Sequence, residues 1–222
     1  MTLQLVRQAR LIDPVQGLDQ VGDVLVRDGQ IEAVAEQLSP PSDTVCEVID
    51  AAGMILGPGL VDLYSTSGEP GNESRETLSE LVEAAAAGGF TRVNLLPNTE
   101  PCMDHPGVVQ QVRSQSGQGV QINVWGALTQ GAEGEQLSQL HDLSQQGILG
   151  LSDGQPLQDW LLIQRLLDYA KPMALTVALW PCLPALAGES AIREGVNALQ
   201  FGLPSASAAA ETSAIAGIIE LI

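Results

Sequence analysis

Residues 58–71 read PGLVDLYSTSGEPG, and this stretch predicts a short strand followed by a loop. Gly59 provides a turn, and the apolar run Leu60–Leu63, interrupted by Asp62, is typical of a buried strand. The run Glu-Pro-Gly at 69–71 then indicates a loop. The sequence pattern changes at this point of the chain, so two domains are predicted, residues 1–57 and residues 58–222.

Residues 1–57 predict a small antiparallel β unit. The segments 3–13 (LQLVRQARLID) and 23–38 (DVLVRDGQIEAVAEQL) alternate apolar and polar residues, and Asp28-Gly29 marks a tight hairpin turn. Residues 45–59 (VCEVIDAAGMILGPG) add a last pair of strands that leads into the second domain.

Residues 58–222 alternate predicted strands and helices. Strands are expected at 60–63, 91–96, 120–127, 148–152 and 173–178, and helices at 75–87, 107–116, 133–146, 157–169 and near 190–199. Repeated βα units predict a parallel sheet covered by helices, either part of a (β/α)8 barrel or a doubly wound sheet. A whole barrel takes roughly 250 residues, so about five units are expected here, with open edges that favour self-association.

The composition predicts an acidic, folded protein. Nine Lys and Arg stand against 27 Asp and Glu, a net charge of −18, which repels nucleic acid and anionic membranes and favours solubility or a basic partner. Three widely spaced cysteines, Cys46, Cys102 and Cys182, indicate reduced thiols rather than disulfides. Without an apolar run that could span a bilayer or form a signal peptide, a cytoplasmic protein is expected.

Four blocks together resemble the dihydroorotase family of the amidohydrolase superfamily: Pro-Gly-x-x-Asp at 58–62, Glu-Pro-Gly at 69–71, Ala-Ala-Ala-Ala-Gly-Gly-Phe-Thr at 84–91, and Pro-Asn-Thr at 97–99. The resemblance continues through Phe201–Pro204 and Ala210-Glu211. It implies an α/β fold in which residues 58–222 are the N-terminal part of a metal-dependent-hydrolase-type (β/α)8 barrel. Residues 1–57 would belong to a small β-sandwich.

The same resemblance places three substitutions at the centre of the family's chemistry. Active members read Pro-Gly-x-x-Asp-x-His-x-His and then Leu-Arg-Glu-Pro-Gly, where both His bind zinc and the Arg holds the substrate carboxylate. Here Tyr64 and Thr66 stand at the His positions and Gly68 stands at the Arg position. A phenol and a hydroxyl are poor zinc donors, and glycine cannot make the paired bonds of a guanidinium. No zinc and no other cofactor is therefore expected.

Two further positions match family residues and are interpreted as vestigial. Asn98 matches a substrate-contacting Asn, and Asp153 matches a metal-ligand carboxylate and is expected as the one ligand left, exposed at a strand end. The fifth-strand segment, residues 176–181, contains no His. His105 and His141 lie too far apart in the pattern to share a metal, and Cys102 and Cys182 have no neighbouring base.

The resemblance thus predicts a non-catalytic dihydroorotase-like protein of pyrimidine biosynthesis. Its expected role is that of a scaffold for aspartate transcarbamoylase, in an oligomer or together with a barrel-completing chain. One alternative is an active zinc-dependent dihydroorotase, converting N-carbamoyl-aspartate to dihydroorotate, completed by a missing C-terminal half or a partner. The other alternative is a decayed fragment.

Overall fold

The computed structural model describes residues 2–41, 44–114 and 119–222. The chain divides between Gly59 and Leu60 into two compact units. The described residues include no helix that is both long enough and apolar enough to cross a membrane.

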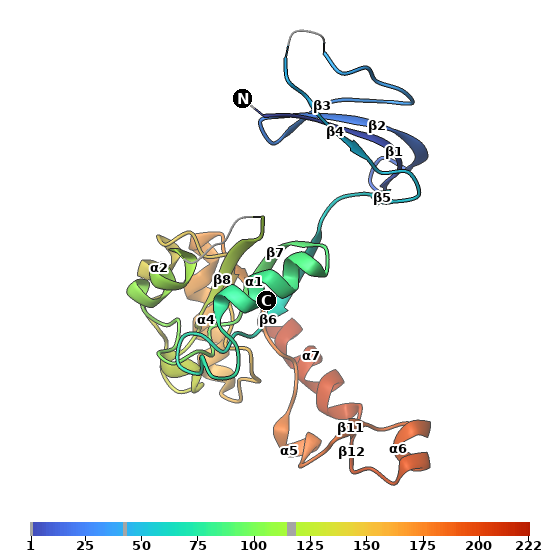
Figure 1. The fold of residues 1–222 in the computed structure, drawn as a ribbon. Coiled ribbons are helices and arrows are strands. Elements are labelled where there is room, and N and C mark those ends of the chain that lie inside the picture. Colours follow the sequence, from blue (N-terminus) through green and yellow to red (C-terminus); the bar gives the residue numbers. More distant parts are fainter. Residues whose placement is uncertain (1, 42–43, 115–118) are drawn as a thin grey trace. The chain divides into compact units, whose positions relative to one another are not determined.

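The N-terminal unit is one small sheet (Figure 1). Its order is β3-β2-β1-β4, with β5 pairing with β1 farther along; the strands are β1 (Leu3–Asp13), β2 (Leu18–Arg27), β3 (Gln30–Ala35), β4 (Glu47–Asp50) and β5 (Ile55–Leu56). The hairpin at Asp28-Gly29 is confirmed, with φ of 49° and 80° at the two turn residues. The expectation of a purely antiparallel unit is wrong, because β4 and β5 lie parallel to β1. The long connection after β3 makes this parallel return possible.

A buried carboxylate stabilises this sheet at a bulge in β1. Gln8 has φ 58° where the pairing of β1 with β2 shifts register. Asp23 accepts the backbone N–H groups of Gln8 at 2.9 Å and Leu38 at 2.8 Å. These two bonds to the ionised form lower the pKa of Asp23. The carboxylate therefore fastens both the bulge and the segment after β3.

The C-terminal unit is built on a parallel sheet in the order β10-β9-β8-β7-β6. The strands are β6 (Leu60–Ser65), β7 (Phe90–Leu95), β8 (Gln121–Gly126), β9 (Gly150–Leu151) and β10 (Thr176–Val177). Each strand lies beside the next in the sequence, and the order never reverses. A doubly wound sheet reverses at a switch point, so the order is that of a barrel. The sheet curls, and the fold is a half-barrel, as predicted.

Helices and short elements connect these strands (Figure 1). They are α1 (Leu78–Ala87), α2 (Pro106–Ser114), η1 (Gln130–Ala132), α3 (Leu140–Ser144), α4 (Trp160–Ala170), η2 (Lys171–Met173), α5 (Pro184–Ala187), β11 (Ile192–Arg193), α6 (Val196–Phe201), β12 (Ser205–Ala206) and α7 (Ala209–Leu221). The core lies between helices and sheet and includes Leu95, Val109, Val124, Leu143, Leu151 and Leu166.

Two predicted helices differ strongly from the structure. The helix predicted over 133–146 is confined to α3, because Gly131 and Gly134 adopt positive φ and Thr129 pairs with Leu137 across the loop. The segment predicted as helical near 190–199 begins instead with strand β11, and α6 starts only at Val196. Part of the predicted helix 107–116 lies outside the described residues.

Candidate functional site

Tyr64, at the first metal position of the resembled family, takes part in a hydrogen-bonded contact across the sheet. Its hydroxyl lies 2.5 Å from Ser152 Oγ, which follows β9. The Tyr64 ring meets the Trp125 ring edge-on, with centroids 6.0 Å apart, and Trp125 Nε1 donates to the Leu63 carbonyl at 3.0 Å. Ser152 is buried, whereas Tyr64 is 41% exposed. A tyrosine thus links β6 to residues from two other strands.

Asp153 is enclosed, contrary to the expectation of an exposed strand-end carboxylate. Its Oδ1 accepts the N–H groups of Leu128 at 2.7 Å and Thr129 at 3.0 Å, and its Oδ2 accepts the Thr129 hydroxyl at 2.6 Å. Both Asp153 and Thr129 are buried. Burial raises the pKa of Asp153, and the three hydrogen bonds oppose that shift. Both oxygens bond the loop after β8, so the carboxylate is committed to structure.

The remaining metal-ligand candidates do not gather around Asp153. Thr66, at the second metal position, is exposed. His105 lies before α2, where its Nδ1 accepts the Gly107 N–H at 3.1 Å, and His141 is exposed on α3. In the part of the chain that the structure describes, no three His, Cys, Asp or Glu side chains lie together as a metal site would require.

Gly68, at the position of the substrate-binding Arg, has no room for a side chain. A Cβ placed there would lie 2.5 Å from the Glu76 carbonyl oxygen and 2.7 Å from that of Asn72. The Gly68 carbonyl accepts the Asn72 N–H at 2.7 Å, which folds the loop back on itself. The loop backbone therefore excludes every residue larger than glycine unless residues 72–76 move.

The neighbouring Glu-Pro-Gly run has structural contacts of its own. Glu69 Oε2 accepts the Leu78 N–H at 2.8 Å, at the start of α1. The Pro70 carbonyl accepts the Glu100 N–H at 3.0 Å, and a Cβ on Gly71 would collide with the Glu100 carbonyl. The run therefore joins the loop after β6 to α1 and to the loop after β7.

The start of α1 carries a second set of caps. Thr77 Oγ1 accepts the Glu80 N–H at 3.3 Å, and Glu80 Oε2 accepts the Thr77 N–H at 2.8 Å, which is a capping box. The helix therefore begins at Leu78 rather than at Arg75 as predicted, and the bond from Glu69 falls on its first residue.

Asn98, which matches a substrate-contacting Asn of the resembled family, lies exposed in the loop between β7 and α2. The loop is closed by the Met103 N–H on the Pro97 carbonyl at 3.0 Å and by the Thr99 hydroxyl on the Pro101 carbonyl at 2.8 Å. The structure thus gives Asn98 a surface position on an ordered turn.

Sequence reasoning missed several residues of the site. Ser152, Trp125 and Thr129 complete the contacts of Tyr64 and Asp153. Asn123 donates to the buried Asn94 at 2.8 Å, between directly paired positions of β7 and β8. The sequence could have indicated the asparagine pair, because Asn94 and Asn123 each interrupt the apolar residues of a predicted strand, and these two strands follow one another along the chain.

The loops that follow the strands are strongly acidic. Residues 66–77, 96–105, 127–139 and 152–159 contain nine Asp and Glu and a single Arg, Arg75. Active sites of barrels lie at this carboxyl end of the strands. These loops would therefore repel an anionic small molecule and attract a basic surface.

Comparison with known proteins gives a consistent family. The dihydro-orotase-like family profile matches residues 53–217. A probable dihydroorotase-like protein of Synechocystis sp. is 39% identical over an alignment that covers all of this chain and 55% of that protein. A dihydroorotase of Geobacter metallireducens is 37% identical, with 96% of this chain and 50% of that protein covered. The chain spans about half the length of these curated relatives.

Solved structures support the fold. An L-hydantoinase (dihydropyrimidinase) from Arthrobacter aurescens superimposes with a TM-score of 0.74 at 19% identity, over all of this chain and 50% of that one. A dihydroorotase superimposes with a TM-score of 0.53 at 15% identity, over 80% of this chain and 50% of that one. The half-barrel, the framing loops and the matched profile lead to one conclusion: this chain belongs to the dihydroorotase-like family.

Proposed function

We propose that this chain is a non-catalytic, cytoplasmic member of the dihydroorotase-like family, and that it serves as a scaffold for aspartate transcarbamoylase. The observation that carries the proposal is the hydrogen bonding of the Asp153 carboxylate. Its oxygens accept three hydrogen bonds from Leu128 and Thr129, while the preceding Ser152 contacts the Tyr64 hydroxyl. The carboxylate that matches a metal ligand of active relatives is here bonded to the protein itself.

The residues present do not fit zinc. Dihydroorotase chemistry uses a metal to polarise the amide and to activate water. Three or four imidazole, thiolate or carboxylate donors are needed, and here the corresponding side chains are a phenol, a hydroxyl and an enclosed carboxylate. No step through a metal is assigned to this chain.

Substrate binding is disfavoured as well. Carbamoyl aspartate and dihydroorotate carry carboxylates, which an arginine would normally pair with. Gly68 has no room for that side chain, and the loops around it carry an excess of Asp and Glu. The local field therefore opposes an anionic substrate.

The family resemblance and the negative charge of these loops support the proposed scaffold role. The acidic loops that follow the strands would bind favourably to a partner surface that presents Lys and Arg. Non-catalytic members of the resembled family act as scaffolds for aspartate transcarbamoylase, so this enzyme is the partner that we propose.

One experiment tests both halves of the proposal. The chain is co-expressed with aspartate transcarbamoylase from the same genome and analysed by size-exclusion chromatography with light scattering at low and high salt. We expect co-elution that weakens as salt rises, because the charges of the acidic loops are screened. Separate elution of a folded chain would rule out the scaffold.

The second arm measures zinc content after dialysis and dihydroorotate hydrolysis with added metal. We expect no stoichiometric zinc and no turnover, and the same result for the double variant Tyr64→His with Thr66→His, because Gly68 still excludes the arginine. Turnover of the unmodified chain that a chelator abolishes would overturn the non-catalytic assignment.

A further inference from the structure

A groove runs between α3 and α4 in the C-terminal unit. It consists of two adjoining cavities of about 330 and 870 Å³. His141 and Tyr169 line both cavities, and the other lining residues come from 137–145 and from 168–173. We call this feature the α3–α4 groove.

The small size of α3 explains why the groove exists. α3 has five residues and α4 has eleven, so the two helices are about 8 and about 16 Å long. The residues before α3 form a loop in which Thr129 pairs with Leu137, instead of further helical turns. α3 therefore leaves part of α4 uncovered, and the side chain of Tyr169, near the end of α4, is 63% exposed.

Apolar side chains line much of the groove. Leu140 is buried, and Leu137 and Met173 are half-buried side chains that pack against the hydrophobic core of the unit. Tyr169 adds an exposed aromatic ring to this surface. A ligand in the groove would thus bury some of its own apolar surface, as ligands of protein grooves usually do.

Asp142 and Asp168 give the groove a negative charge. Asp142 of α3 lines one cavity and Asp168 of α4 lines the other, and both residues are exposed. Arg165 and Lys171 are the nearest cationic residues along this part of the chain, but neither lines either cavity. The electrostatic potential in the groove therefore favours a cation.

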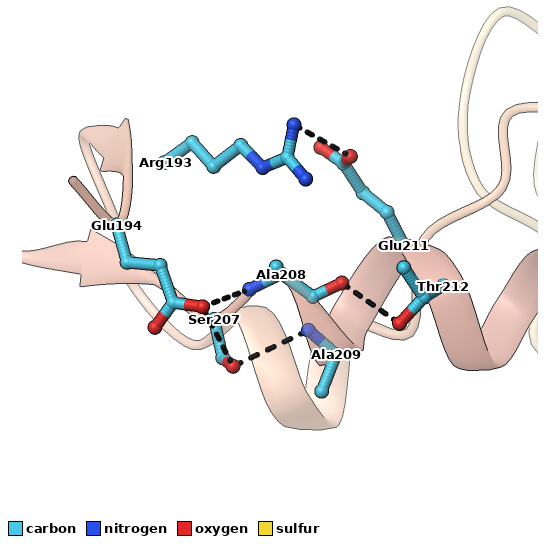
Figure 2. Close-up of polar contacts among 7 residues, drawn as sticks. All are labelled: Arg193, Glu194, Ser207, Ala208, Ala209, Glu211 and Thr212. Atoms are coloured by element: carbon cyan, nitrogen blue, oxygen red, sulfur yellow. Dashed lines mark hydrogen bonds and ion pairs between the residues drawn. The ribbon is translucent and has the colours of Figure 1, made fainter.

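These two carboxylates differ from others in the same unit. Figure 2 shows Glu194 accepting a backbone N–H, at 2.7 Å, and Glu211 beside Arg193, at 3.7 Å. Among the residues that the structure describes, neither Asp142 nor Asp168 accepts a hydrogen bond with its side chain or forms an ion pair. Both carboxylates can therefore pair with a ligand without breaking a contact within the chain.

We propose that the α3–α4 groove binds an arginine-bearing polypeptide segment of a partner protein, with guanidinium groups paired with Asp142 and Asp168 and stacked on Tyr169. A guanidinium is planar, pairs with a carboxylate through two hydrogen bonds and stacks on an aromatic face, whereas the ammonium of lysine is a compact point charge. The apolar lining would receive the alkyl part of the segment.

The charge of the chain argues against a second copy as the occupant. Two copies that each carry a net charge of −18 repel one another, so a basic partner fits the groove better. The proposal goes beyond the scaffold role, because it assigns a chemical class of ligand to side chains of α3 and α4, whichever protein carries the arginine.

A peptide titration tests the groove. The ¹⁵N-labelled 222-residue chain is titrated with acetyl-Leu-Arg-Ala-Arg-Leu-amide and followed by NMR. We expect saturable shift changes within residues 137–145 and 168–173. A peptide with citrulline at both arginine positions keeps their shape and loses their charge, and it should bind about tenfold more weakly. A lysine version keeps the charge and loses the plane, and it should fall between the two.

Variants of the chain locate the binding. Tyr169→Leu keeps an apolar side chain and removes the ring, and Asp168→Asn removes one charge, so each should raise the Kd of the arginine peptide about threefold or more. Leu161→Ala on α4 and Glu83→Gln on α1 are the matched controls at exposed positions outside the groove. All four positions are exposed, and urea unfolding of each variant shows that it folds.

Three results would overturn the groove: no saturable shift with millimolar arginine peptide, equal affinity for the citrulline peptide, or binding that Tyr169→Leu and Asp168→Asn leave unchanged. The last result would mean a general attraction of cations to an acidic chain. A peptide that binds as expected, while aspartate transcarbamoylase elutes separately, would keep the groove and remove the scaffold role, so the two failures are distinguishable.

Discussion

Tyr64 Oη and Ser152 Oγ lie 2.5 Å apart although their strands, β6 and β9, are separated in the sheet by β7 and β8. The contact can form only because the sheet curls. Trp125 of β8 reaches the same place and donates to the Leu63 carbonyl at 3.0 Å. Tyr64, at a metal-ligand position of the family, therefore connects β6 to the residue that follows β9.

Removing the Tyr64 hydroxyl should destabilise the C-terminal unit. Tyr64→Phe keeps the ring beside Trp125 and leaves the buried Ser152 hydroxyl without this partner, at an expected cost of about 1 kcal/mol. Urea unfolding followed by tryptophan fluorescence reports on this unit alone, because Trp125, Trp160 and Trp180 all lie in it. Tyr169→Phe, at an exposed ring, is the control and should leave the midpoint unchanged.

Asp153 should make the C-terminal unit less stable as pH rises. Burial raises its pKa, so the native protein binds this proton more tightly than the unfolded chain does. Its contribution is most favourable below the unfolded pKa of about 3.9 and is lost as pH rises through the higher native pKa. Asp153→Asn, which resembles the neutral acid, should remove that part of the pH dependence.

Fluorescence-detected urea unfolding between pH 4 and 7 measures the Asp153 effect. The exposed carboxyl of Asp168 provides the control variant, Asp168→Asn, which should keep the slope of the unmodified protein. If Asp153→Asn and the unmodified protein show parallel pH profiles, the carboxyl does not titrate differently in the two states.

A side chain at Gly68 should strain the loop after β6. Gly68→Ala places a Cβ against the Asn72 and Glu76 carbonyl oxygens, so a loss of about 1–3 kcal/mol is expected, and Gly68→Arg should be no better tolerated. The comparison is Gly107→Ala in α2, where a Cβ has ordinary contact with His105, which should be neutral or slightly stabilising. Thermal melts of the three variants decide; equal melting temperatures for Gly68→Ala and Gly107→Ala would contradict the steric account.

Cys102 should react slowly with alkylating reagents in the folded protein. Burial, with the charges of Asp104 and Asp153, raises its pKa to about 12, so little of the reactive thiolate exists at pH 8. Iodoacetamide labelling followed by peptide mass spectrometry should show Cys102 modified far more slowly in native protein than in urea, where the shift disappears. Equal labelling rates in the two conditions would show that the native environment does not protect it.

The βα order was predictable from the sequence because apolar strands and glycine-terminated helices have distinct periods. The strand centred on Val93 and the helix ended by Gly88 are examples. The loop after β8 was not predictable in this way. There, Gly131 and Gly134 take positive φ and the Ser138 hydroxyl bonds the Ala127 carbonyl, so local bonds replace the expected helix.

The identities at the site were readable from the sequence, whereas their environment was not. The substitutions at positions 64, 66 and 68 can be identified directly in residues 58–71. The enclosure of Asp153 depends on Thr129, a residue 24 positions earlier, which the pairing of β8 with β9 brings near. The exclusion of a side chain at Gly68 likewise depends on how residues 72–76 fold back.

The Glu-Pro-Gly run at residues 69–71 bears on how the sequence signature of this family should be interpreted. Each of its residues makes a backbone-level contact, with Leu78 or with Glu100, that has nothing to do with catalysis. These contacts depend on the fold alone, whereas Tyr64 and Thr66 stand at positions where the resembled family has metal-binding His. A sequence signature that contains both kinds of residue can therefore keep its structural residues while the residues at its metal positions differ. The Glu-Pro-Gly run therefore reports on how this loop is built, and the residues at positions 64 and 66 are the ones that bear on metal binding.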